Sequence, residues 1–285
     1  MHILSIIAMF KNESSIIEQW IQHYLLEGVN HFYLIDNGST DNYEIIIKKY
    51  IKKITLIKDS YRQEKNTQNI LINKHFLNKI KNESKWVIVC DIDEYIYNIN
   101  NNENIINFLN TKENFSRIWI PWKLFGASKN PNIIPNLIND LTQRQNKINI
   151  NDKGYGKSII KCSDLILLET HYSTVTGLTL KLNLTYSLHC NHYKLISKKY
   201  FKDIKCIRGG GQSGLSKNYK LDHFYIENKL YNEITDNILK NKINYLKQNF
   251  NYNLYKSKYK DLSYMNNINL WNHWVKYGIV ENRKL

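Results

Sequence analysis

Two aspartates separated by one residue are the sharpest chemical feature of this sequence. Asp91 and Asp93 directly follow the apolar residues 86–90. In an extended chain, side chains two residues apart point the same way, so both carboxylates can face one hard cation. Such oxygen ligands suit Mn²⁺ or Mg²⁺, which keep part of their coordination shell for substrate phosphates. Two aspartates can also occur at a solvated strand end. The position of the pair in the predicted fold therefore has to distinguish a metal site from such a strand end.

Two further polar clusters, residues 9–13 and 36–41, follow predicted strands at residues 2–8 and 31–35. Ligands of open α/β sheets bind beyond the carboxyl ends of the strands. The residues around the two aspartates follow a strand in the same way. The three clusters should therefore meet at one edge of a sheet, which predicts a pocket of the kind that holds a nucleotide.

The elements that must position these clusters alternate between strand and helix. Apolar runs predict strands, and the i, i+3, i+4, i+7 spacing of apolar residues predicts helices. Ser15 and Glu18 match a capping box at the start of the first helix, and Gly28 should end it. Such β-α-β units predict a mostly parallel sheet. The predicted strands are residues 2–8, 31–35, 54–57 and 86–90, and the predicted helices follow Ser15 and cover residues 45–50 and 65–81.

The second half of the chain is less regular. A polar stretch at residues 126–156 predicts a long loop over the ligand-binding edge. From about residue 225 the sequence becomes helical and basic. We therefore predict one domain at residues 1–224 and a small helical appendix at residues 225–285. The remaining predicted elements are a helix at 103–110 and strands at 117–122, 158–160, 165–168 and 184–188.

The ordered motifs of residues 1 to about 215 resemble glycosyltransferases of the GT-A fold. The closer resemblance is to the family-92-like group within the family-2 superfamily. The motifs are Lys11-Asn12-Glu13, Asp36-Asn37-x-Ser39-x-Asp41, Asp91-Ile92-Asp93-Glu94, Trp122-x-x-Phe125-Gly126, Lys157-Ser158-Ile159, His171, Asn191-His192-Tyr193, Lys205 and Arg208-Gly209.

This resemblance implies a Rossmann-like α/β fold and a metal-dependent transferase of the hexosyltransferase type. The donor would be a nucleoside diphosphate sugar, in particular a UDP-sugar, the acceptor a hydroxyl group such as that of a glycan, and the anomeric carbon would invert. Asp93 would bind Mn²⁺ or Mg²⁺ together with Asp91, which also lies by the ribose, and with His192. The uridine would be held by the loop from Ala8 to Glu13, with Phe10 and Asn12, and by Asp36.

Two of these residues have plain structural alternatives. His192 also fits a core or strand-end histidine that is hydrogen-bonded to the backbone, and Asp36 also fits a turn residue at the entry to a helix.

Cations near the donor would favour departure of the nucleoside diphosphate, because bond cleavage leaves negative charge on it. Lys205 and Arg208 precede a glycine-rich stretch at residues 209–214 and are candidates on a loop that closes over the donor. A flexible basic linker is the alternative. Arg62 is a weaker candidate for the same role. The glycines do not follow a strand and open a helix, which excludes a dinucleotide-binding loop.

An inverting reaction also needs a general base for the acceptor hydroxyl. The candidates are Asp164, Glu169 and His171, and we favour His171, although spacing does not choose among them. The aromatic residues Trp119, Trp122 and Phe125 could stack on an acceptor sugar or belong to the core.

Charge and composition bound the other function classes. The 285 residues are 42% hydrophobic and carry a formal net charge of +15, of which residues 191–285 supply +11. A basic nucleic-acid-binding protein and an inactive nucleotide-sugar-binding protein are therefore alternatives. We expect no nucleic acid partner, because the first 190 residues lack the excess and no basic-aromatic module is visible. No apolar run reaches the length of a membrane span, and no leader sequence is evident, so a cytoplasmic enzyme is expected.

Overall fold

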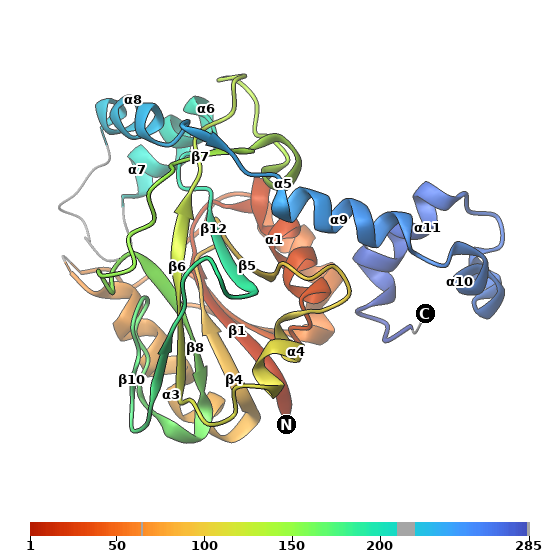
Figure 1. The fold of residues 1–285 in the computed structure, drawn as a ribbon, viewed down its shortest axis with the longest axis horizontal. Helices are drawn as coiled ribbons and strands as arrows, with labels where there is room; N and C mark the ends of the chain where they lie inside the picture. The colour runs from red at the N-terminus through yellow and green to blue at the C-terminus, as the bar shows by residue number, and fades with distance from the viewer. Residues whose placement is uncertain (64, 210–219, 284–285) are drawn as a thin grey trace.

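A curled nine-stranded sheet forms the centre of the computed structural model, which describes residues 1–63, 65–209 and 220–283 (Figure 1). Its strand order is β3-β2-β1-β4-β8-β6-β12-β5, and β11 pairs with β6. The strands of this sheet are β1 (His2–Phe10), β2 (His31–Asp36), β3 (Ile54–Lys58), β4 (Ser84–Val89), β5 (Glu94–Asn98), β6 (Arg117–Leu124), β8 (Gly156–Lys161), β11 (Thr179–Lys181) and β12 (Leu188–His192). Two small sheets pair β7 (Gln143–Arg144) with β13 (Ile234–Thr235) and β9 (Leu165–Leu167) with β10 (Thr174–Val175).

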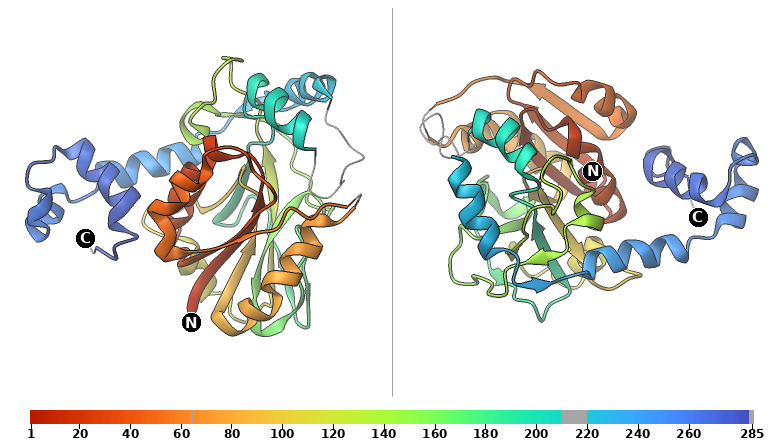
Figure 2. Two further views of the ribbon diagram at one scale, coloured as in Figure 1. Left: turned by 180° about the vertical axis from the view of Figure 1, so that it is seen from behind. Right: turned by 90° about the horizontal axis from the view of Figure 1, so that it is seen from above.

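Helices cover both faces of the large sheet and continue into a small module at the carboxyl-terminal end (Figure 2). The α-helices are α1 (Ser14–Leu26), α2 (Tyr43–Ile47), α3 (Thr67–Glu83), α4 (Ile105–Asn110), α5 (Leu137–Asp140), α6 (Lys198–Tyr200), α7 (Cys206–Arg208), α8 (Leu221–Leu230), α9 (Ile238–Gln248), α10 (Tyr252–Lys258) and α11 (Asn267–His273). Shorter helical turns are η1 (Lys48–Lys53), η2 (Cys162–Asp164), η3 (Phe201–Lys205), η5 (Lys260–Leu262) and η6 (Trp274–Gly278).

The parallel part of the sheet is the part that the alternating pattern predicts. β1 pairs in parallel with β2 and with β4, and β2 pairs in parallel with β3. Side chains of β1 alternate between the faces: Ile6 packs beside α1, whereas Ile7 packs beside α3. The predicted fold class, an α/β fold with a mostly parallel sheet between helices, is confirmed.

Antiparallel strands complete the sheet, and the sequence reading missed part of them. β8 lies antiparallel between β4 and β6, and β12 lies between β6 and β5. The strand predicted at 184–188 begins only at Leu188, because a turn held by the Asn183 side chain precedes it. β5 was not predicted. A tight turn, closed by the Glu94 amide on the Asp91 carbonyl at 3.1 Å, separates it from β4, and it places His192 opposite Glu94.

The start of α1 also differs from the prediction. Ser15 and Glu18 form no capping box, and the first residue of the helix, Ser14, donates its amide to Asp41 Oδ2 at 2.8 Å. The cap therefore comes from the turn after β2 and holds two polar clusters together. Gly28 ends the helix as predicted, with a φ of +90° that favours glycine.

The chain beyond α8 forms β13, which pairs with β7 in a separate small sheet, before it reaches the terminal module. The predicted loop at 126–156 contains α5 and β7, and β7 pairs with β13. In α9, Lys242 forms a buried ion pair with Glu27 at the end of α1. The terminal module, residues 249–283, contains α10, η5, α11 and η6. It has its own apolar cluster around Phe250 and Trp271, which also packs on Leu26 (Figures 1 and 2). The division at residue 224 stays a prediction.

Within the described ranges, no helix is both long enough and apolar enough to cross a membrane.

Candidate nucleotide-sugar site

One pocket of about 310 Å³ lies at the carboxyl ends of β1, β2 and β4, the edge that the three polar clusters predict. β6 and β12 and the helical segments η3, α7 and α8 complete its wall. Its lining residues are Met9, Phe10, Lys11, Glu13, Asn37, Arg62, Gln68, Asp91, Asp93, Trp122, Leu124, Tyr155, His171, His192, Lys194, Lys205, Arg208, Gly209, Glu227 and Tyr231.

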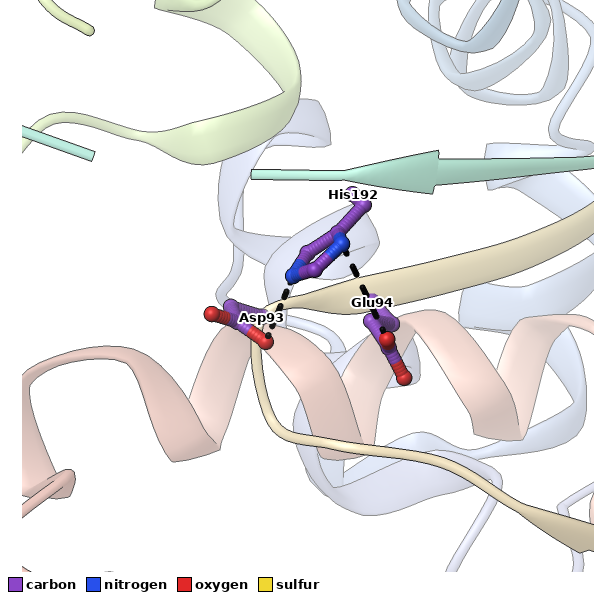
Figure 3. Close-up of side chains that lie close together, drawn as sticks. All are labelled: Asp93, Glu94 and His192. Carbon is purple, nitrogen blue, oxygen red and sulfur yellow. Dashed lines mark ion pairs between the residues drawn. The ribbon is translucent and has the colours of Figure 1, made fainter. Parts of the chain in front are cut away.

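The imidazole of His192 lies between the carboxylates of Asp93, the residue before β5, and Glu94, the first residue of β5 (Figure 3). Its Nε2 is 3.6 Å from Asp93 Oδ1, and its Nδ1 is 3.9 Å from Glu94 Oε1. The pairing of β12 with β5 fixes this arrangement, and the Tyr193 amide also donates to the Asp93 carbonyl at 2.8 Å.

Asp93 and the Nε2 of His192 fit a divalent cation, and Glu94 faces the other nitrogen of the His192 ring. The ligand atoms of Asp93, Glu94 and His192 lie within 4.8 Å of one another, and all three residues are buried. Both Glu94 Oε1 and His192 Nδ1 are buried without a hydrogen-bond partner in the described part of the chain. Carboxylate oxygen and imidazole nitrogen suit Mn²⁺ and related ions. Glu94 is a member of this cluster that the sequence reading did not single out.

Asp91 lies beside this cluster with different partners. Its carboxylate accepts hydrogen bonds from Gln68 Nε2 at 2.8 Å and from Lys157 Nζ at 2.9 Å. Lys157 is fully buried and also pairs with Glu94 at 3.1 Å. Burial opposes ionisation of Asp91, but the charge of Lys157 together with the hydrogen bonds from Gln68 and Lys157 lowers the pKa of Asp91. The Asp91 side chain keeps 35% of its surface exposed, so it can contact a ligand in the pocket.

Two cations reach the pocket from the segment that contains η3 and α7. Lys205 forms a buried ion pair with Asp93, and Arg208 Nη1 lies 2.9 Å from Glu13 Oε2. Burial opposes ionisation of Asp93, but Lys205 and His192 hold its pKa well below the usual range. Lys205, Arg208 and Arg62 all line the pocket, as the sequence predicts. Residues 210–214 of the predicted glycine-rich loop lie outside the described residues.

Three residues predicted to hold the uridine do not line this pocket. Ala8 lies in the apolar core, with no exposed surface. Asn12 accepts the Thr40 amide, and Asp36 accepts the Ser39 amide at 2.7 Å. The Asn12 side chain links the loop after β1 to the loop after β2, and the Asp36 side chain orders the loop after β2. Phe10 and Glu13 from the same prediction do line the pocket.

The three candidate bases separate clearly. His171 lines the pocket, and its Nδ1 lies 3.2 Å from the Gly156 carbonyl oxygen. Burial, with a further contribution from the charge of Lys157, lowers the pKa of His171 to about 4. Asp164 instead accepts a hydrogen bond from Ser116, and Glu169 contacts Thr174; neither is among the lining residues.

Of the aromatic candidates, Trp122 alone lines the pocket, with its ring 4.5 Å from that of His192. Trp119 and Phe125 are buried.

The sequence reading missed the part of the wall that comes from α8. Glu227 and Tyr231 line the pocket there, and Glu227 pairs with Lys194, two residues after His192. No spacing signal connects Glu227 to the aspartates, because only the packing of α8 across the sheet edge brings them together. Both residues also fall beyond the predicted domain boundary at 224.

Comparison with known proteins places the chain in a family. Among solved structures, one of a mycobacterial protein is 14% identical over 56% of this chain and 53% of its own, with a TM-score of 0.34. Glucosyl-3-phosphoglycerate synthase from Mycobacterium tuberculosis, in complex with Mn²⁺, UDP and glucosyl-3-phosphoglycerate, is 18% identical over 43% of this chain and 44% of its own, with a TM-score of 0.29. The chain thus spans about half the length of these proteins, and likeness at this level supports no statement on function.

No curated protein matches the sequence significantly. The model of glycosyltransferase family 92 matches residues 3–254, which is most of the chain. The predicted resemblance is thereby confirmed, and the protein belongs to glycosyltransferase family 92.

Proposed function

We propose that this protein transfers a sugar from a nucleoside diphosphate donor, in particular a UDP-sugar, to a hydroxyl acceptor such as a glycan, with inversion at the anomeric carbon. The observation that carries the proposal is the pocket at the strand ends, where Asp93 and His192 face each other beside the cations Lys205 and Arg208. Family membership supports the class of reaction.

In this proposal, Asp93 and the Nε2 of His192 hold a Mn²⁺ or Mg²⁺ ion. Glu94 lies on the other side of the ring and would accept the Nδ1–H of His192, which fixes the ring orientation, as carboxylates commonly do around metal-binding histidines. When bound, the ion would supply positive charge to the departing diphosphate. Asp91, which Lys157 and Gln68 hold in the pocket wall, would contact the donor ribose.

Lys205 and Arg208 would bind the donor diphosphate. Lys205 is paired with Asp93, and Arg208 is paired with Glu13. Both cations are therefore already held at the pocket wall, where a bound diphosphate could contact them. Such preorganised positive charge lowers the barrier when charge develops on the leaving group. Arg62, whose Nε is buried and unpaired among the described residues, would add to this field.

The acceptor would enter between Trp122 and the α8 wall. Trp122 and Tyr155 offer aromatic surface, and the buried Nε1 of Trp122 has no partner in the described part of the chain. Aromatic rings and free donors of this kind suit a sugar.

Nucleotide release from UDP-glucose, UDP-galactose and UDP-N-acetylglucosamine tests the proposal. We expect UDP release from at least one donor that requires Mn²⁺ or Mg²⁺ and stops after chelation. Proton NMR of the product should show an anomeric configuration opposite to that of the donor. Absence of release from every donor, or release that chelation leaves unchanged, would contradict the proposed function.

A further inference from the structure

Glu227 is a carboxylate in the pocket that the donor and metal assignments do not use. It lies in the last half of α8, next to the pocket wall formed by Tyr231, whose amide donates to the Glu227 carbonyl. Its Oε1 pairs with Lys194 Nζ at 2.5 Å. Its Oε2 is buried and has no hydrogen-bond partner among the residues that the structure describes.

A buried carboxylate oxygen without a hydrogen-bond donor lowers the stability of the fold unless a ligand supplies the donor. A buried oxygen without a donor loses its solvation and gains nothing in return, so such atoms are rare in native proteins and need a specific explanation. The Lys194 pair holds the other oxygen and thereby fixes the orientation of the carboxylate. A hydroxyl group that enters the pocket is the kind of partner that Oε2 lacks.

We propose that Glu227 is the general base of the proposed transfer, an inference that rests on the proposed function. The acceptor oxygen forms a bond to the anomeric carbon while its proton passes to Glu227 Oε2. The bond from the anomeric carbon to the phosphate oxygen breaks, and its electron pair leaves with the nucleoside diphosphate. Glu227 then returns the proton to solvent, and the carboxylate is restored.

The other candidate bases meet this role less well. Glu227 Oε2 has no hydrogen-bond partner among the described residues, whereas His171 Nδ1 lies 3.2 Å from the Gly156 carbonyl oxygen and a protonated His171 ring would be opposed by the charge of Lys157. Asp164 and Glu169 are not in the pocket wall. His171 therefore becomes part of the wall around the acceptor.

Variants of Glu227 test this inference with UDP-glucose, UDP-galactose and UDP-N-acetylglucosamine in the presence of Mn²⁺. We expect Glu227→Gln to lower UDP release at least about 100-fold, the usual contribution of a general base. The rise of its thermal midpoint with UDP and Mn²⁺ should stay within about 1 °C of the native rise, because donor binding does not use the carboxylate. Asp222→Asn is the matched control, an exposed carboxylate on the same helix, and should stay within about twofold of native UDP release.

Rescue by azide separates a base from a residue that only holds the pocket together. Azide needs no deprotonation, so it should restore UDP release by Glu227→Ala at least about tenfold and yield a glycosyl azide. The inference is overturned if Glu227→Gln keeps UDP release within about threefold of native, or if azide leaves Glu227→Ala unchanged. These outcomes overturn only the role of Glu227, because native turnover of a donor leaves the proposed function intact, whereas a native protein that turns over no donor contradicts the proposed function itself.

Discussion

The charge state of a buried side chain depends on whether fixed partners compensate for the water that it has lost. Asp93 stays ionised because Lys205 and His192 lie against it, although burial alone would favour the neutral acid. Where no countercharge is present, the neutral form prevails. His23 is buried against Tyr95, and this burial lowers the pKa of His23 to about 3, although the contact of a ring nitrogen with the Ile96 carbonyl oxygen at 2.8 Å opposes the shift.

His23 should therefore make the free energy of unfolding decrease as the pH is lowered. Below the ordinary histidine pKa of 6.5 the unfolded chain takes up a proton that the folded chain refuses, until the pH approaches the folded-state pKa of about 3. The stability that His23 gives relative to His23→Gln should thus drop by about 1.4 kcal/mol between about pH 5.5 and 4.5. Urea unfolding of both proteins measures it, and a difference that does not change with pH would contradict the buried neutral ring.

At this scale the sequence predicts the residues that share a strand end. Asp91 and Asp93 lie in the pocket, because local spacing and the end of a predicted strand place them there. Glu227 could not be predicted, since its position depends on how α8 crosses the sheet. The partner of Asp41, the Ser14 amide, was missed for the same reason: it comes from another loop.

Among the elements, apolar periodicity predicts those whose buried face is apolar. β1 to β4 and helices α1 and α3 are of this kind, and the predicted ends differ from the structure by a few residues. β12 escapes this pattern, because it buries His189, Asn191 and His192, which pair with polar groups inside the protein or line the pocket. A strand whose buried residues are polar for functional reasons gives no alternation to read.

The contact of α9 with α1 depends on one buried ion pair, and a variant of α1 tests it. Glu27→Gln leaves Lys242, whose side chain is 2% exposed, without its countercharge, so the free energy of unfolding should fall by about 3–5 kcal/mol. Glu18→Gln on the same helix is the matched control. It removes pairs with Lys49 and Lys276 whose side chains are about 30% exposed, so the loss should stay below about 1 kcal/mol. Equal losses in urea unfolding would show that burial of the pair does not matter.

Most of the net positive charge of the molecule comes from residues 191–285, and some of these basic residues line the pocket. Lys194, Lys205 and Arg208 belong to the basic residues 191–285 and line the pocket beside Asp93. A net charge of +15 also favours the approach of an anionic donor. The terminal module continues past the family match at residue 254, and it packs on α1 through its own aromatic cluster.

The central claim, a metal-dependent nucleotide site around Asp93, is tested most directly by thermal midpoints with UDP, with and without Mn²⁺. Ligand that binds only the folded state stabilises it by mass action, so UDP with Mn²⁺ at about 100 times its dissociation constant should raise the native midpoint by about 5 °C. Asp93→Asn should lose this rise, measured from its own midpoint, whereas Asp164→Asn outside the pocket should keep it. A rise that does not need Mn²⁺, or one that persists in Asp93→Asn, would contradict the account.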